Sequence, residues 1–136
     1  MKKELHTEFE IKKGILSSSE EQVLEKLIRA SKLVVPLYEK QINEELPGSN
    51  FYPEDATKEE IKEAAENDPE ILSHYTVVER GKNGGLTAVP YHEKYAEEMV
   101  QIAALLDEAA ELSEDTQFAE FLSARAQSFR DDSWSE

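Results

Sequence analysis

The sequence has 136 residues and contains no cysteine, only five glycines and five prolines, and no long hydrophobic run. Because there are no thiols, disulfide bonds and thiolate zinc sites are excluded, which fits a reducing compartment. No apolar run approaches the ~20 residues that a transmembrane helix needs, and the early lysines are not followed by the apolar region of a signal peptide. We therefore expect a cytoplasmic protein without a membrane partner.

Basic residues are also scarce, and their shortage is uneven along the chain. The sequence carries 15 Lys and Arg against 30 Asp and Glu, a net charge of −15. Residues 1–50 hold eight basic and nine acidic residues, whereas residues 51–136 hold seven and 21. An acidic surface repels a phosphate backbone, so we expect no nucleic-acid partner. Most of these carboxylates are expected to solvate exposed helix faces, although an acidic face also suits a basic protein surface.

Motifs that carry catalytic chemistry are missing as well. The sequence has no HExxH helix and no GxSxG turn, and its GKNGG stretch lacks the pattern of a phosphate-binding loop. The three histidines, His6, His74 and His92, fall in different predicted elements, whereas a zinc site needs three or four converging ligands. We therefore assign no catalytic, cofactor-binding or metal-binding residue to this chain, although His74 and His92 flank one predicted hairpin.

Patterning in the first third predicts an extended arm followed by a helix. Apolar and polar residues alternate in residues 1–16, as is typical of an extended segment. Serines then provide N-caps for a helix over residues 17–46 that carries an apolar stripe. Pro36 lies inside this helix, where it removes a backbone hydrogen bond. We expect a kink at Pro36, or two helices that meet there.

The rest of the chain predicts short helices, a hairpin and a helix pair. In chain order these are a loop with short helices over 47–75, a β-hairpin over 76–90 and an antiparallel helix pair over 91–130. Asn83-Gly84 is the predicted tight turn of the hairpin, and the first helix of the pair is expected to begin near Tyr91 and end near Leu112. The predicted fold is one mainly α domain over residues 1–136, a bundle of about five helices with one small β-hairpin. A hairpin is marginally stable alone, so it must lie on helices or join a larger sheet.

Two groups of side chains stand out from this pattern. Arg125 is a charged residue on the otherwise apolar face of the last helix. A buried guanidinium needs a partner, so Arg125 either extends to the edge of the core or pairs with a carboxylate of another element. The aromatic residues near the hairpin, which include Tyr52 and Tyr91, either belong to the core or line a pocket.

Three segments together resemble the N-terminal portion of dipeptidyl peptidase III-like zinc hydrolases, especially the shorter bacterial members. These segments are NFYPEDATKEEI, HYTVVERGKNGGLTAVPYHEKYAEEM and IAALLDEAAELSEDTQFAEFLSARAQSFRDDSW. The matching features are the YPED and TKEE opening, the hairpin that runs into AVPY, and FLSARA ahead of DD. The resemblance covers residues 17–134. The zinc-binding HExxGH helix of that family lies beyond this region, so no zinc ligand is carried over.

The resemblance implies scaffold roles for Pro90, Tyr91 and Tyr95 at the joint between hairpin and helix, and for Arg125 in the last helix. It also suggests that Tyr52 and Tyr91 face a cleft. The chain would then be the non-catalytic N-terminal part of a larger zinc peptidase, helping to form a peptide-binding cleft, and its end after RDDSW would be a truncation. Zinc and the peptide substrate would belong to the full-length protein, and the partner would be the missing C-terminal catalytic lobe. The alternative is a stand-alone acidic helical module that binds another protein surface without enzymatic activity.

Overall fold

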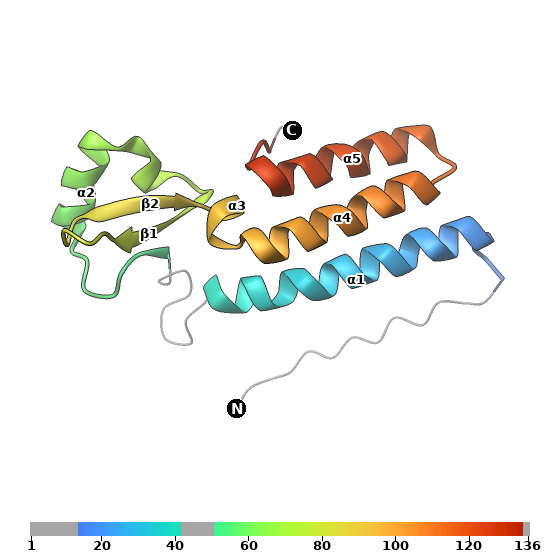
Figure 1. Ribbon diagram of the computed structural model, residues 1–136, viewed down its shortest axis with the longest axis horizontal. Coiled ribbons are helices and arrows are strands. Elements are labelled where there is room, and N and C mark those ends of the chain that lie inside the picture. The colour runs from blue at the N-terminus through green and yellow to red at the C-terminus, as the bar shows by residue number, and fades with distance from the viewer. Residues whose placement is uncertain (1–13, 42–50, 135–136) are drawn as a thin grey trace, which may run out of the picture.

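The computed structural model describes residues 14–41 and 51–134 (Figure 1). Its helices are α1 (Ser18–Gln41), α2 (Lys58–Asn67), the 3-10 helix η2 (Pro69–Leu72), α3 (Tyr91–Lys94), α4 (Ala96–Leu112) and α5 (Thr116–Asp131), and its strands are β1 (Thr76–Arg80) and β2 (Leu86–Pro90). The prediction of a mainly α fold with about five helices and one β-hairpin is confirmed. Residues 1–13 of the predicted arm and residues 42–46 of the predicted first helix lie outside the described residues.

The larger part of the molecule is a layer of three helices, α1, α4 and α5, with α4 in the middle (Figure 1). We call it the helix layer. Because α4 contacts a helix on each side, it contributes the most buried residues: Met99, Ile102, Ala103, Leu105, Leu106, Ala109 and Ala110. Ala103 and Ala109 are completely buried, and such small side chains let neighbouring helices approach closely. The core of the fold therefore lies along α4.

Residues 51–90 form a smaller unit at one end of the layer, which we call the head (Figure 1). It contains α2, η2 and the antiparallel hairpin, in which Thr76 pairs with Pro90 and Arg80 with Leu86. No helix in residues 14–41 and 51–134 combines the length and the apolar character needed to cross a bilayer.

α1 runs through Pro36 as one continuous helix, so the predicted alternative of two helices meeting there is wrong. A proline inside a helix costs roughly 3 kcal/mol because its nitrogen has no hydrogen to donate. Pro36 and Lys32 are both exposed, so water can reach the carbonyl of Lys32 that loses its partner. Burial of Val23, Ala30 and Leu37 in the core offsets the remaining cost.

The hairpin turn is one residue longer than predicted. Gly84 N–H donates to the Gly81 carbonyl at 2.9 Å, and Gly81 N–H donates to the Gly85 carbonyl at 2.8 Å. Lys82 and Asn83 are therefore the central residues of the turn, and the prediction of an Asn83-Gly84 turn is wrong. Gly84 follows with φ of +82°, a left-handed conformation that glycine adopts without steric cost. This is the three-residue hairpin loop, in which a turn is followed by a left-handed residue.

The predicted long helix from Tyr91 to Leu112 is two helices, because the backbone leaves helical geometry at Tyr95. Tyr95 has φ of −116° and ψ of 33°, and its side chain is buried. Its N–H still donates to the Tyr91 carbonyl, and its carbonyl accepts from Met99 N–H, each at 2.9 Å. The chain thus changes direction between α3 and α4 and keeps these two bonds. We call the segment Pro90–Tyr95 the joint, because it connects the head to the helix layer.

Candidate functional site

The two residues predicted to face a cleft, Tyr52 and Tyr91, line the same cavity, which has a volume of about 200 Å³. The other lining residues are Phe51, Leu72, Ser73, His74 and Thr76. They come from the loop before α2, from η2 and the residues after it, from the start of β1 and from α3. The fold therefore brings together two tyrosines that are 39 residues apart in the sequence.

Tyr52 is half-buried, and its hydroxyl donates a hydrogen bond to the Ile71 carbonyl at 3.2 Å. Ile71 is only 1% exposed, so this bond ties the loop that carries Tyr52 to a fixed point in η2. Leu72, the next residue, is 59% exposed although it is apolar, and it lines the same cavity. One wall of the cavity is thus fixed by a buried residue, while an exposed leucine extends its apolar surface.

Tyr91 lies at the start of α3, immediately after Pro90 ends β2. Its N–H donates to the Tyr75 carbonyl at 2.9 Å, which continues the hairpin pairing by one residue. Its ring centroid lies 6.2 Å from that of Phe51 and 6.0 Å from that of Tyr95. Burial raises the pKa of Tyr91 to about 12, with smaller contributions from neighbouring Tyr95 and Asp132. The hydroxyl is therefore neutral at pH 7 and able to donate a hydrogen bond.

The joint is closed from the other side by the end of α5. Asp132 Oδ2 lies 2.6 Å from His92 Nδ1 and accepts from His92 N–H at 3.3 Å. The Asp132 side chain is only 12% exposed, and its backbone has φ of +58° at the C-cap of α5. Its N–H donates to the Ser128 carbonyl at 2.9 Å, so Asp132 both ends the helix and contacts the joint. The AVPYH and RDDSW motifs therefore meet in space.

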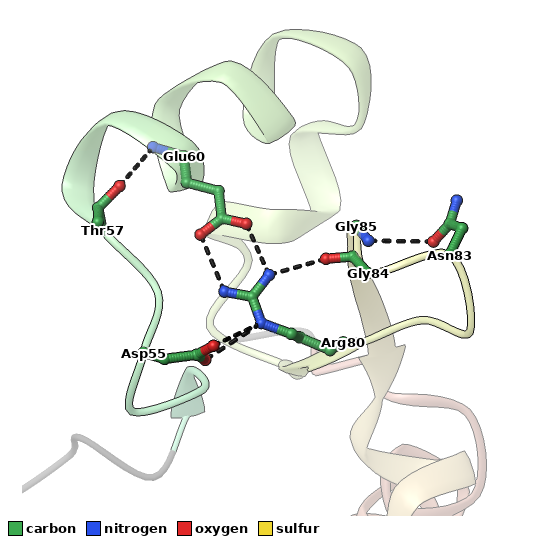
Figure 2. Close-up of polar contacts among 7 residues, drawn as sticks. All are labelled: Asp55, Thr57, Glu60, Arg80, Asn83, Gly84 and Gly85. Atoms are coloured by element: carbon green, nitrogen blue, oxygen red, sulfur yellow. Dashed lines mark hydrogen bonds and ion pairs between the residues drawn. The ribbon is translucent and has the colours of Figure 1, made fainter.

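Arg80 lies at the end of β1, and its guanidinium binds three segments of the head: the loop before α2, the first turn of α2 and the hairpin turn (Figure 2). Its Nε donates to both carboxylate oxygens of Asp55, at 3.1 and 3.0 Å. Its two terminal nitrogens donate to the two oxygens of Glu60, at 2.6 and 3.0 Å, and one of them also donates to the Gly84 carbonyl at 2.8 Å. These hydrogen bonds lower the pKa of both carboxyl groups and raise the pKa of Arg80. We call Asp55, Glu60, Arg80 and Gly84 the Arg80 network.

The residues predicted from the resemblance fall into two places. Pro90, Tyr91 and Tyr95 all lie in the joint, close to the cavity. Arg125 lies elsewhere, half-buried on α5, with its guanidinium carbon 5.3 Å from the centroid of the Phe121 ring, a cation–π arrangement. Three of the four predicted scaffold residues therefore lie in the joint, and one of them, Tyr91, lines the cavity together with Tyr52.

Sequence reasoning missed the Arg80 network and the contact between His92 and Asp132. One signal pointed to Arg80, since it is the only arginine between Arg29 and Arg125 and lies in the acidic part of the chain. His92 was considered as a neighbour of His74 near the hairpin. The structure gives His92 a carboxylate partner from α5 and places His74 in the cavity wall.

The described part of the chain contains no group of three or more His, Cys, Asp or Glu residues arranged to hold a metal ion. Nδ1 of His92 is already engaged by Asp132. The residues described here therefore do not fit a zinc site.

The fold belongs to a class seen in solved peptidase structures, where it makes up part of a longer chain. Two similar structures are DPP III from Caldithrix abyssi and dipeptidyl-peptidase III from Corallococcus sp. strain EGB. The first superposes with a TM-score of 0.80 and 24% identity over 90% of this chain and 32% of that chain. The second has a TM-score of 0.77 and 24% identity over 91% of this chain and 33% of that chain.

The resemblance to dipeptidyl peptidase III is thus confirmed at the level of the fold. A structural similarity at 24% sequence identity shows a shared fold and no more. The chain spans about one third of the length of either peptidase. Scans against protein-family models and against curated proteins gave no match.

Proposed function

We propose that this chain is the non-catalytic, N-terminal helical part of a dipeptidyl peptidase III-like zinc hydrolase and that it forms one wall of a peptide-binding cleft. The observation that carries the proposal is the shared fold, which extends over 90% of this chain but only 32% of the Caldithrix abyssi peptidase. The catalytic part of such a protein is then the natural partner of this chain. The motifs around YPED, AVPY and RDDSW support the same assignment.

In this proposal the zinc ion and the residues that activate water belong to the catalytic part. The described residues of this chain do not fit a zinc site, so we assign no catalytic step to them. Their contribution is to bind and orient the peptide. Binding energy from such positioning groups lowers the barrier by holding the scissile bond in place.

The cavity between Tyr52 and Tyr91 has the chemistry of a peptide subsite. Its volume of about 200 Å³ is close to that of one large amino-acid residue. Aromatic ring faces and Leu72 offer apolar contact, while the neutral Tyr91 hydroxyl offers a hydrogen bond to a peptide carbonyl. The Tyr52 hydroxyl is engaged by Ile71, so Tyr52 serves as a wall and Tyr91 as the polar contact.

A chimera tests both parts of the proposal. Residues 17–134 replace the structurally equivalent third of the Caldithrix abyssi peptidase, and zinc content and dipeptide release are measured. We expect the chimera to retain zinc and to release dipeptides. Tyr52→Ala and Tyr91→Ala should each raise KM more than they lower kcat, because they remove binding surface without touching the reacting atoms.

Tyr38→Ala is the matched control, since Tyr38 is 60% exposed on α1 and is not among the residues that line the cavity. A folded, zinc-loaded chimera that releases no dipeptide would refute the family assignment. An active chimera whose KM is indifferent to both cavity substitutions would refute the cleft role. Zinc-dependent peptide hydrolysis by the isolated chain would contradict the assignment of catalysis to the other part.

A further inference from the structure

We infer that Arg80 is a positioning residue for the Tyr52–Tyr91 cavity: it fixes the two walls that carry Tyr52 and Leu72 relative to each other. The expected effect of Arg80 on peptide binding rests on the proposed function, whereas its effect on the position of Tyr52 does not. Arg80 is not among the residues that line the cavity, but it lines a neighbouring pocket together with Tyr52 and Pro53, so its influence passes through the residues around it.

The first connection runs through the loop before α2. Asp55 binds Arg80, and the Ala56 N–H donates to the Pro53 carbonyl at 3.0 Å, which closes a turn directly after Tyr52. Pro53 has a nearly fixed φ, so the turn leaves little freedom between Tyr52 and Asp55. Holding Asp55 therefore restrains where the Tyr52 ring enters the cavity wall.

The second connection runs through α2 and η2. Glu60 makes a two-pronged contact with Arg80 from the first turn of α2 (Figure 2). α2 and η2 meet at Asp68, which caps both helices: its N–H donates to the Ala64 carbonyl at 2.9 Å, and its Oδ1 accepts from Glu70 N–H at 3.1 Å. The Asp68 caps therefore couple α2 to η2, which carries Leu72 and is also held by buried Ile71 and by the Thr76 hydroxyl, which donates to the Glu70 carbonyl at 2.7 Å.

Burial fixes α2 only weakly, because none of its residues is fully buried and Ile61, Ala64 and Ala65 are half-buried. Such a helix depends more on its caps and on polar contacts for its position. Among the ion pairs of the described residues, the Arg80–Glu60 pair links α2 to the hairpin and the Arg80–Asp55 pair links the preceding loop to it. The third contact, from Arg80 to the Gly84 carbonyl, sets the guanidinium against the hairpin turn.

The inference is tested with Arg80→Gln in the full 136-residue chain, with Arg130→Gln as the matched control. Arg130 pairs with Asp107 within the helix layer, and its side chain is 38% exposed compared with 30% for Arg80. The five tyrosines are replaced by 3-fluorotyrosine, and their ¹⁹F NMR signals are assigned with single Tyr→Phe variants. Affinity for the tetrapeptide Ala-Phe-Ala-Ala is measured on the same samples.

We expect Arg80→Gln to shift and broaden the Tyr52 signal and to weaken tetrapeptide binding by about fivefold, the order of a lost surface ion-pair network. Arg130→Gln should change neither, although both variants lose one charged pair. Arg80→Lys should resemble Arg80→Gln, because an ammonium cannot make the two-pronged contact with Glu60. If Arg80 only stabilised the fold in general, Arg80→Gln and Arg130→Gln would both lower the melting temperature, and neither would change the Tyr52 signal.

The outcomes separate the two claims. A wild-type chain that does not bind the tetrapeptide refutes the proposed function, while the Tyr52 signal still decides the role of Arg80. An Arg80→Gln chain with an unchanged Tyr52 signal overturns the positioning inference. If Arg80→Gln does not fold, Asp55→Ala replaces it, since the Asp55 side chain is 72% exposed and this variant removes the contact that leads to Tyr52 while it keeps the Glu60 pair. An unchanged Tyr52 signal in Asp55→Ala likewise overturns the inference.

Discussion

The helix layer and the head are stabilised by different forces. In the layer, α1, α4 and α5 share one apolar core, and Ile102 at its centre is 1% exposed. In the head, Ile71, Val77 and Val78 are buried and Val77 belongs to the core of the layer, whereas α2 has no buried residue. The position of α2 depends on the Thr57 cap and on the Arg80 network.

One domain thus combines a part that is held by apolar burial with a part that is held largely by exposed polar contacts. Apolar burial depends little on mild acid and on a moderate rise in ionic strength, whereas exposed ion pairs respond to both. The cavity lies where the two regions meet, and its walls come mostly from the head. Substitutions and acid should therefore affect the helix layer and the head differently, and the losses of stability should differ in size.

The largest effect is expected in the helix layer, for Ile102→Ala. Removing a fully buried aliphatic side chain destabilises a protein by about 2–5 kcal/mol, because packing is lost and a cavity remains. Urea unfolding measures this loss. Val100→Ala on the same helix is the control, since Val100 is 61% exposed and should change stability by less than about 0.5 kcal/mol. Equal losses for the two variants would show that α4 is not the centre of the core.

A smaller and local effect is expected for Thr57→Ala. The Thr57 hydroxyl accepts from Glu60 N–H at 3.1 Å at the start of α2, and losing such a cap costs about 1 kcal/mol. Amide hydrogen exchange should quicken in α2 and remain slow in α4. If exchange quickened equally in both helices, the head and the layer would have to unfold as one unit.

Acid should open the head before the layer. The Arg80 hydrogen bonds lower the pKa of Asp55 and Glu60, so their stabilising contribution is complete above the ordinary carboxyl range and is lost as pH falls through the lowered values. Exchange of the α2 amides should therefore quicken at acid pH while α4 stays protected. The Glu60→Gln variant should lose most of this pH dependence. Loss of α4 protection at the same pH as α2 would contradict the separation.

The smallest effect concerns the Tyr91 hydroxyl. Its pKa is raised to about 12, so the stability that it contributes is complete below the ordinary tyrosine pKa and is lost as pH rises toward 12. Absorbance at alkaline pH should show a tyrosine that ionises near pH 12, and Tyr91→Phe should remove this step. If the step survives in Tyr91→Phe, the raised pKa belongs to another group.

Local patterns predicted most helices and strands, because apolar helix stripes, serine caps and β-branched runs each depend on residues that are close in the sequence. The break at Tyr95 was missed because YHEKYAEEM suits a helix at every position, and the bend follows from burying Tyr95 beside Tyr91. The turn at Gly81–Gly84 was missed because Asn83-Gly84 also fits a shorter loop.

The contacts that build the site could not be read from the sequence. Arg80 lies 25 residues from Asp55 and 20 from Glu60, and His92 lies 40 residues from Asp132. Such pairs depend on how distant elements come together, and many other carboxylates in this acidic chain were equally eligible partners. The pattern left a pocket lined by Tyr52 and Tyr91 as one of two alternatives, and the resemblance to a family added that they face a cleft.

Whether the Tyr52–Tyr91 cavity receives a peptide is decided by intermolecular nuclear Overhauser effects between the isolated chain and Ala-Phe-Ala-Ala. We expect contacts from the phenylalanine side chain of the peptide to the rings of Tyr52 and Tyr91. The groove between α1 and the turn that joins α4 to α5, which Leu24 and Phe118 line, serves as the internal control. Contacts to Leu24 and Phe118 alone, or none at saturating peptide, would contradict a peptide-binding role for the cavity.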